Sequence, residues 1–194
     1  VAEEIRRKGA KPYVIPMGGA IPTGVLRYVE AAFEIAEQVE KMGIKPKYII
    51  HASGSGGTQA GLILGSKLAK LNAKVIGIDI IGKPRLQQKI LELARETTEK
   101  YGFKATVEPE DVIAYDYSFG GYGVLSRKII KVMVDVARSE GLLLDPVYTA
   151  KAFAGLMDLV RKGVIEQESQ VIIYSYWRIP DNIPVWRRSM EADE

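Results

Sequence analysis

The stretch 53–58 combines glycines with hydroxyl side chains, and it lies between a short apolar run and a segment of helical periodicity. Such a loop turns the backbone from a strand into a helix, whose first unpaired N–H groups then face the loop. N–H groups and hydroxyls together suit a phosphate. The residues that would bind it are Gly54, Ser55, Gly56, Gly57 and Thr58. A tight turn that needs glycine for positive φ angles is the simpler interpretation.

A nucleotide site is a second interpretation of the same loop. The spacing is not the Walker pattern, which needs a lysine after its last glycine, and it is not G-x-G-x-x-G. Asp79, at the end of the next apolar run, is the residue that would imitate the acidic ribose partner of a dinucleotide site. A non-catalytic phosphate- or nucleotide-binding module therefore stays an alternative.

Two tyrosines are candidates for proton transfer. The segment 115–123 is rich in tyrosine and glycine, where a structural loop more often carries Asn, Asp and Ser. Glycines beside Tyr122 would present its phenol in a cleft. Tyr148 directly precedes Thr149, which we expect near the N-cap of a helix. A tyrosine that acts as an acid or base needs a neighbour, usually a cation, that moves its pKa toward neutrality.

Two further polar residues receive simpler interpretations. Lys151 has the amine needed for a Schiff base, but we expect a solvated or phosphate-directed helix residue. His51 is the only histidine, so we expect a strand residue near the cleft and not a catalyst.

Strand-like and helix-like segments alternate along the chain, which predicts a parallel, twisted α/β sheet with helices on both faces. Ligands bind such sheets at the carboxyl ends of the strands, where the three loops above would meet. The predicted strands are 13–15, 48–52, 75–81, 107–113 and 170–174, and the predicted helices are 1–8, 23–42, 58–71, 84–101, 122–138 and 149–162.

Composition excludes several classes of protein. The 27 basic and 24 acidic residues are interleaved, which argues against a nucleic-acid partner. Cysteine is absent, so thiolate chemistry is excluded and a reducing compartment fits. No apolar run approaches the roughly 18 residues of a membrane span, and the secretory-signal pattern is missing at the N-terminus. We therefore expect a cytoplasmic protein with no membrane partner.

Four motifs together resemble one enzyme family. Pro-Met-Gly-Gly-Ala at 16–20, Gly-Ser-Gly-Gly-Thr-Gln-Ala-Gly-Leu at 54–62, Tyr-Gly at 122–123 and Asp-Pro-Val-Tyr-Thr-Ala-Lys-Ala at 145–152 are similar to the aminocyclopropane-carboxylate deaminase and D-cysteine desulfhydrase family. These enzymes have the tryptophan-synthase-β-like fold and use pyridoxal 5′-phosphate. The resemblance runs from about residue 2 to residue 173, which predicts a cofactor domain at 1–173, incomplete relative to the family.

The resemblance implies roles for individual residues. The glycine-rich loop would hold the cofactor phosphate, Tyr122 and Tyr148 would lie near a small amino-acid substrate, and Thr149 would face the pyridine nitrogen. Deaminases that open the cyclopropane ring carry Glu at the last position, whereas desulfhydrases carry Thr or Ser. A neutral hydroxyl makes the cofactor a weaker electron sink, which suits elimination of a good leaving group. The resemblance therefore favours D-cysteine desulfhydrase over the deaminase, and it implies a homodimer in the full-length form.

The chain departs from the family at both ends. The family's Schiff-base lysine belongs to an N-terminal region that these residues do not include, so we expect a fragment that is inactive by itself. At 174–194 the tail is atypical. If the residues from Tyr174 are written as suitable codons and read one base later, they give Ile-His-Thr-Gly-Gly-Tyr, as in the family. Tryptophan has only one codon, and in the shifted frame the codons of Trp177 and Trp186 both yield glycine. We hypothesise a frameshifted, poorly docked tail, with a different natural tail as the alternative.

Overall fold

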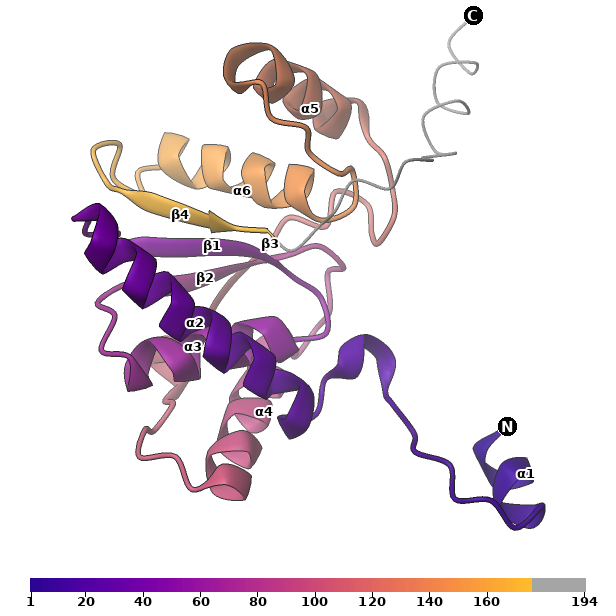
Figure 1. Ribbon diagram of the computed structural model, residues 1–194. Helices are drawn as coiled ribbons and strands as arrows, with labels where there is room; N and C mark the ends of the chain where they lie inside the picture. Colours follow the sequence, from indigo (N-terminus) through magenta and orange to yellow (C-terminus); the bar gives the residue numbers. More distant parts are fainter. Residues whose placement is uncertain (176–194) are drawn as a thin grey trace, which may run out of the picture.

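The computed structural model describes residues 1–175, and Figure 1 shows helices on both faces of a central sheet. Within these residues the strands are β1 (Tyr48–Ser53), β2 (Lys74–Asp79), β3 (Ile113–Asp116) and β4 (Val171–Tyr174). The helices are α1 (Ala2–Arg7), α2 (Pro22–Met42), α3 (Gly57–Leu68), α4 (Leu86–Tyr101), α5 (Arg127–Glu140) and α6 (Thr149–Arg161), with short 3₁₀ turns at Met17–Gly19 and Pro109–Asp111.

The four strands pair in parallel in the order β3-β2-β1-β4. All six residues of β1 are buried, because this strand lies between β2 and β4 and is covered on both faces. A continuous apolar run is the sequence pattern of such a strand. The predicted parallel α/β sheet is therefore confirmed, and the loop 53–58 follows the carboxyl end of a central strand.

Helices α2, α3 and α4 pack on one face of the sheet, and α6, with α5 outside it, packs on the other (Figure 1). Helix α2 begins with Pro22 and ends at Gly43, which adopts a left-handed φ of 64°. Helix α3 approaches α2 through two glycines, Gly61 and Gly65, where a side chain would collide with the α2 backbone. This contact fixes the start of α3, and with it the loop 53–58, against the rest of the fold.

Three predicted elements were wrong or displaced. Residues 13–15 form no strand: Tyr13 and Ile15 are 73% and 70% exposed, and no ladder pairs them within the described part of the chain. The strand predicted at 107–113 instead begins at Ile113, because Pro109 opens a 3₁₀ turn closed by a capping box. The helix predicted from Tyr122 begins at Arg127, and Ser126 caps it by accepting a hydrogen bond from the Ile129 N–H.

The predicted tail at 174–194 lies outside the described residues except for its first two. Tyr174 ends β4, and its ring packs edge-on against Tyr28 of α2 with the ring centres 6.5 Å apart. Within residues 1–175, none of the helices is both long and apolar enough to cross a membrane.

Candidate functional site

The glycine-rich loop joins the end of β1 to the start of α3. Gly56 is the N-cap of α3 and adopts a φ of 91°, a left-handed conformation that favours glycine. The N–H groups of the first helical turn therefore face out of the loop, where the helix dipole adds partial positive charge. Ser53, directly before the loop, is buried, and its Oγ has no hydrogen-bond partner within residues 1–175.

A cavity of about 640 Å³ opens beside this loop, a volume typical of small-molecule sites. Its lining residues come from segments that are far apart in the sequence: Met17, Gly18, Tyr28, Ser53, Gly54, Ser55, Gly56, Thr58, Ile80, Ile81, Lys83, Lys89, Tyr122 and Tyr148. The structure thus brings together six of the eight residues singled out from the sequence. Gly57 is buried as the first residue of α3, and Thr149 lies beside the cavity and does not line it.

Gly18 also lines the cavity and lies tight against the glycine-rich loop. It adopts a φ of 69°, and a Cβ atom built on it would lie 2.6 Å from Ser55 Oγ. Only glycine leaves room for Ser55 in its present position. The motif 16–20 therefore belongs to the same site as the loop 53–58, although 32 residues lie between the two motifs.

Two lysines give this cavity positive charge. Lys83 follows β2 and Lys89 belongs to α4; both are exposed, and neither is in an ion pair among those of residues 1–175. The sequence analysis missed both residues. The rule that ligands bind at the carboxyl ends of parallel strands points to Lys83, since it lies four residues beyond the end of β2.

The two candidate tyrosines meet at the mouth of the cavity. The Tyr122 and Tyr148 hydroxyl oxygens are 2.6 Å apart, and the rings are edge-on with centres 5.9 Å apart. Either phenol can donate this hydrogen bond, so a proton on one oxygen is shared with the other. Lys83 and Lys89 line the same cavity as this pair.

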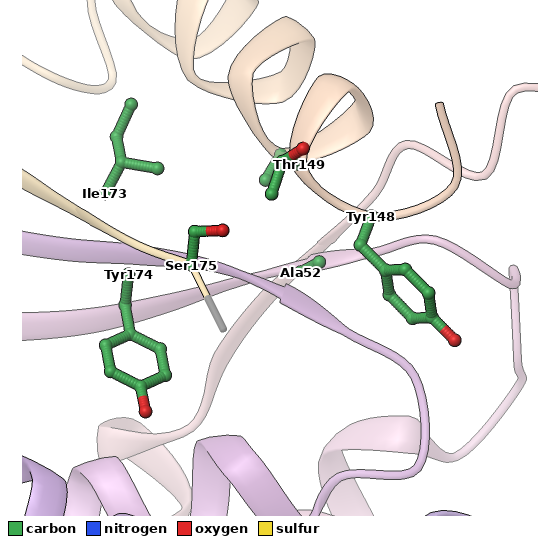
Figure 2. Close-up of a pocket in the computed structure, with 7 residues that line it drawn as sticks. Ala52, Tyr148, Thr149, Ile173, Tyr174 and Ser175 are labelled. Carbon is green, nitrogen blue, oxygen red and sulfur yellow. The ribbon is translucent and has the colours of Figure 1, made fainter. Parts of the chain in front are cut away.

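Thr149 is the first residue of α6, and Asp145 fixes its position. Its Oγ1 donates to Asp145 Oδ2 at 2.5 Å, and its backbone N–H donates to the same oxygen at 2.8 Å. The other carboxylate oxygen, Oδ1, accepts from the N–H groups of Val147 and Tyr148. Figure 2 shows Thr149 and Tyr148 side by side at the start of the helix, with the hydroxyl and the phenol pointing in different directions. The pocket drawn there holds only about 10 Å³, too little for a ligand.

The expectation of a solvated Lys151 was wrong. The side chain is fully buried, and its Nζ donates to the carbonyl oxygens of Gly121 at 2.6 Å and Ser118 at 2.7 Å. Burial lowers the pKa of this amine below its ordinary value. Helical periodicity alone did not show that the segment before α5 folds over this face of α6.

His51 is a buried residue of the central strand β1, as expected. Its Nδ1 lies 2.9 Å from the Ala52 carbonyl oxygen, and burial lowers its pKa from 6.5 to about 4. The imidazole is therefore neutral at physiological pH, and it does not line the cavity.

Asp79 does not offer a free carboxylate for a ribose. Its Oδ1 accepts from the N–H groups of Ile81 and Gly82, and its Oδ2 accepts from that of Lys83. Asp79 therefore shapes the loop after β2, which carries cavity-lining residues. This arrangement weakens the nucleotide-binding alternative.

Comparison with known proteins agrees with the geometry. A family model described as pyridoxal-phosphate dependent enzyme matches residues 1–175. A Pyrococcus abyssi protein with the provisional name 1-aminocyclopropane-1-carboxylate deaminase is 44% identical over 164 residues, which are 84% of this chain and 49% of the relative. The 1-aminocyclopropane-1-carboxylate deaminase of Rhizobium rhizogenes is 36% identical over 173 residues, covering 88% of this chain and 51% of the relative.

A solved structure described as an ACC deaminase homologue superposes with a TM-score of 0.78 at 44% identity, covering 89% of this chain and 51% of that one. A hydrogen sulfide-producing enzyme from Fusobacterium nucleatum shares the fold at 15% identity, with a TM-score of 0.52. The chain spans about half the length of the curated relatives it matches. Since the family model covers residues 1–175 and the motifs that carry the resemblance lie around one cavity, the chain belongs to the pyridoxal-phosphate dependent enzyme family.

Proposed function

We propose that this chain forms the phosphate-binding and substrate-facing part of a pyridoxal-phosphate-dependent lyase that acts on D-cysteine. The reaction converts D-cysteine and water into pyruvate, ammonia and sulfide. The observation that carries the proposal is the cavity shared by the glycine-rich loop and the Tyr122–Tyr148 pair. The opening of the cyclopropane ring of 1-aminocyclopropane-1-carboxylate is the second candidate, favoured by the names of the relatives.

The residues present fit a phosphate ester. The loop leads into the N-terminus of α3, and Thr58 lies on the first turn of this helix. Gly18 leaves room for the Ser55 side chain. Ser53 adds a buried hydroxyl without a partner within residues 1–175, and buried polar groups normally have one. When bound, pyridoxal phosphate supplies an electron sink for the charge that develops at the substrate Cα.

The chain's own residues would bind and hold protons around that cofactor. The N–H groups of 54–58 and the Thr58 hydroxyl would bind the phosphate, and Lys83 and Lys89 would offset its charge. The Tyr122 and Tyr148 hydroxyls would hold a proton at the substrate end, since their oxygens share one hydrogen bond. Bulky rings on that side would also exclude water from the reacting atoms.

Thr149 supports D-cysteine over the cyclopropane substrate. In the family resemblance this position faces the pyridine nitrogen; here Thr149 lies beside the cavity, and its neutral hydroxyl donates to Asp145. A neutral partner would leave the ring nitrogen less protonated than a carboxylate would, and the cofactor would then be a weaker electron sink. Sulfide is a good leaving group, so its elimination demands less of the sink than the opening of a carbon ring.

The test has a binding part and a turnover part. Pyridoxal phosphate titrated into this chain should bind, with inorganic phosphate as a competitor. For turnover, residues 1–175 replace the matched part of the Pyrococcus abyssi relative, and the chimera receives D-cysteine or 1-aminocyclopropane-1-carboxylate. We expect sulfide and pyruvate from D-cysteine. Ammonia from the cyclopropane compound without sulfide from D-cysteine would make the chain part of a deaminase instead.

We also propose that the full-length enzyme is a homodimer, as the family resemblance implies. Analytical ultracentrifugation of the chimera measures its mass directly. A monomer at micromolar concentration that still turns over substrate would contradict this assembly.

A further inference from the structure

Lys151 has an unusual environment for a lysine. It lies on the first turn of α6, it is fully buried, and no carboxylate of residues 1–175 pairs with it. Its Nζ instead donates to the carbonyl oxygens of Gly121 and Ser118 and lies 3.5 Å from that of Ile80. Burying an ammonium is costly unless hydrogen bonds compensate it, and a methionine would fill the same volume without that cost. The carbonyl contacts are therefore what the ammonium provides here.

The two closest carbonyls belong to one turn. Residues 118–121 include three consecutive left-handed conformations, with φ values of 51° at Phe119, 97° at Gly120 and 123° at Gly121. Phe119 is sterically strained in this conformation, because its Cβ lies close to the following carbonyl oxygen. Within the turn, the Gly121 N–H donates to the Ser118 oxygen at 3.1 Å. The ammonium thus holds the turn at both ends.

The residue directly after this turn is Tyr122. Tyr148 is the N-cap of α6, and Lys151 lies on the first turn of this helix. Tyr148 meets the hydroxyl of Tyr122, and Lys151 meets the backbone just before Tyr122. The N-terminal end of α6 therefore contacts the segment 118–122 at two points: Tyr148 does so at the cavity, and Lys151 does so away from it.

We propose that Lys151 is a positioning residue, whose buried ammonium holds the turn 118–121 so that the Tyr122 phenol meets Tyr148 at the cavity. Lys151 does not line the cavity, so it does not touch the ligand itself. The consequence for ligand binding rests on the proposed function, whereas the placement of Tyr122 does not.

The first test needs no ligand. In Lys151→Met the volume is kept and the N–H donors are lost. We expect the NMR contact between the Tyr122 and Tyr148 rings to vanish and amide exchange at 118–124 to rise at least tenfold, with the far-UV circular dichroism unchanged. Lys131→Met is the matched control, because Lys131 is an exposed residue of α5. An unchanged ring contact in Lys151→Met would overturn the proposal.

A second variant covers the case in which Lys151→Met does not fold. Gly121→Ala strains the turn from its own side, because a φ of 123° disfavours alanine, while the nearest atom to its new Cβ is 3.9 Å away. The same loss of the Tyr122–Tyr148 contact is expected. A retained contact in Gly121→Ala together with a misfolded Lys151→Met would assign Lys151 to general stability and overturn the proposal.

The second test uses phosphopyridoxyl-D-alanine, a stable adduct of the cofactor and an amino acid, and inorganic phosphate. Lys151→Met should weaken the adduct at least fivefold and leave phosphate unchanged. Tyr122→Phe should weaken the adduct similarly, and the double variant should lose no more than either single one. Additive losses, or an equal loss for phosphate, would contradict positioning through Tyr122. If no variant binds either probe, the proposed function fails, and the ring contact still decides the role of Lys151.

Discussion

A Cβ atom on Gly18 would lie 2.6 Å from Ser55 Oγ and 2.7 Å from Ser55 Cβ, so the two loops of the cavity touch at a position that admits only glycine. The contact joins the segment before α2 to the loop before α3. Because the second loop is the proposed phosphate site, its shape depends on a residue that donates nothing to the ligand.

Gly18→Ala should therefore weaken the binding of pyridoxal phosphate about tenfold or more, because the new methyl group displaces Ser55. The measurement is a fluorescence titration. Gly19→Ala is a matched control: Gly19 has a similar φ of 58°, but a Cβ there meets nothing within 4 Å. Equal losses in the two variants would show that backbone strain, and not the contact with Ser55, controls affinity.

Gly65→Ala should lower the free energy of unfolding by about 1–3 kcal/mol, the usual cost of overpacking. An alanine would ordinarily gain about 1 kcal/mol over glycine inside a helix, so the predicted sign is reversed. The reason is that a Cβ on Gly65 lies 2.6 Å from the Ala32 Cβ and from the Val29 carbonyl oxygen.

Urea unfolding measures this change. Ala32→Gly in the Gly65→Ala background removes the collision with the Ala32 Cβ and should recover part of the loss. If Gly65→Ala proves more stable than the parent, α2 and α3 do not pack as closely as described.

Acid should destabilise the protein through His51. Its folded pKa of about 4 lies below the unfolded value of 6.5, so the unfolded chain binds this proton first as the pH falls. The stabilisation is complete above pH 6.5 and is lost between pH 6.5 and 4. The free energy of unfolding should fall by up to about 1.4 kcal/mol per pH unit, or about 3 kcal/mol in total.

The chain has a single histidine, so its imidazole NMR signal can be followed without assignment. A titration midpoint near 4 is expected, and one near 6.5 would show that the ring reaches solvent. His51→Gln provides the control for carboxylates that titrate in the same range, because glutamine stays neutral at every pH.

Thr149→Val should destabilise the fold by about 1–3 kcal/mol, the cost of leaving a buried donor without its acceptor. The Thr149 hydroxyl accepts from the buried Asp145 N–H at 2.7 Å and donates to Asp145 Oδ2 at 2.5 Å, and valine removes both hydrogen bonds. Thr149→Ser keeps the hydroxyl and should cost less than half as much. Thermal unfolding of the three proteins gives the comparison, and equal losses for Val and Ser would assign the effect to the lost methyl packing.

The sequence predicted the site better than the elements at its margins. The apolar run of β1 and the glycines after it are local signals, and both tyrosines lie where their loops were expected to meet. The strand predicted at residues 13–15 was wrong because three apolar residues form a strand only beside a partner strand. Whether a partner is present cannot be read from the local sequence.

Lys151 shows most clearly what local patterns leave out. A lysine on an amphipathic helix is ordinarily exposed. Lys151 is buried because a loop about 30 residues earlier in the sequence contacts it through the carbonyl oxygens of Ser118 and Gly121. Lys83 and Lys89 were missed for a related reason: a single lysine, whether after a strand or on a helix, carries no pattern of its own.

The strand order has a consequence for how the protein folds. The central strand β1 pairs on one side with β2, its neighbour in sequence, and on the other with β4, which is the last strand of residues 1–175. Pairings between distant segments form slowly, so one edge of β1 stays open until nearly all of these residues are assembled. During that interval, the apolar strand β1, which is buried in the folded protein, can pair with other chains. Such an exposed edge promotes aggregation. Tyr148, which lines the cavity, also lies late in the sequence. A ligand in this cavity would therefore stabilise only molecules in which the whole sheet has formed.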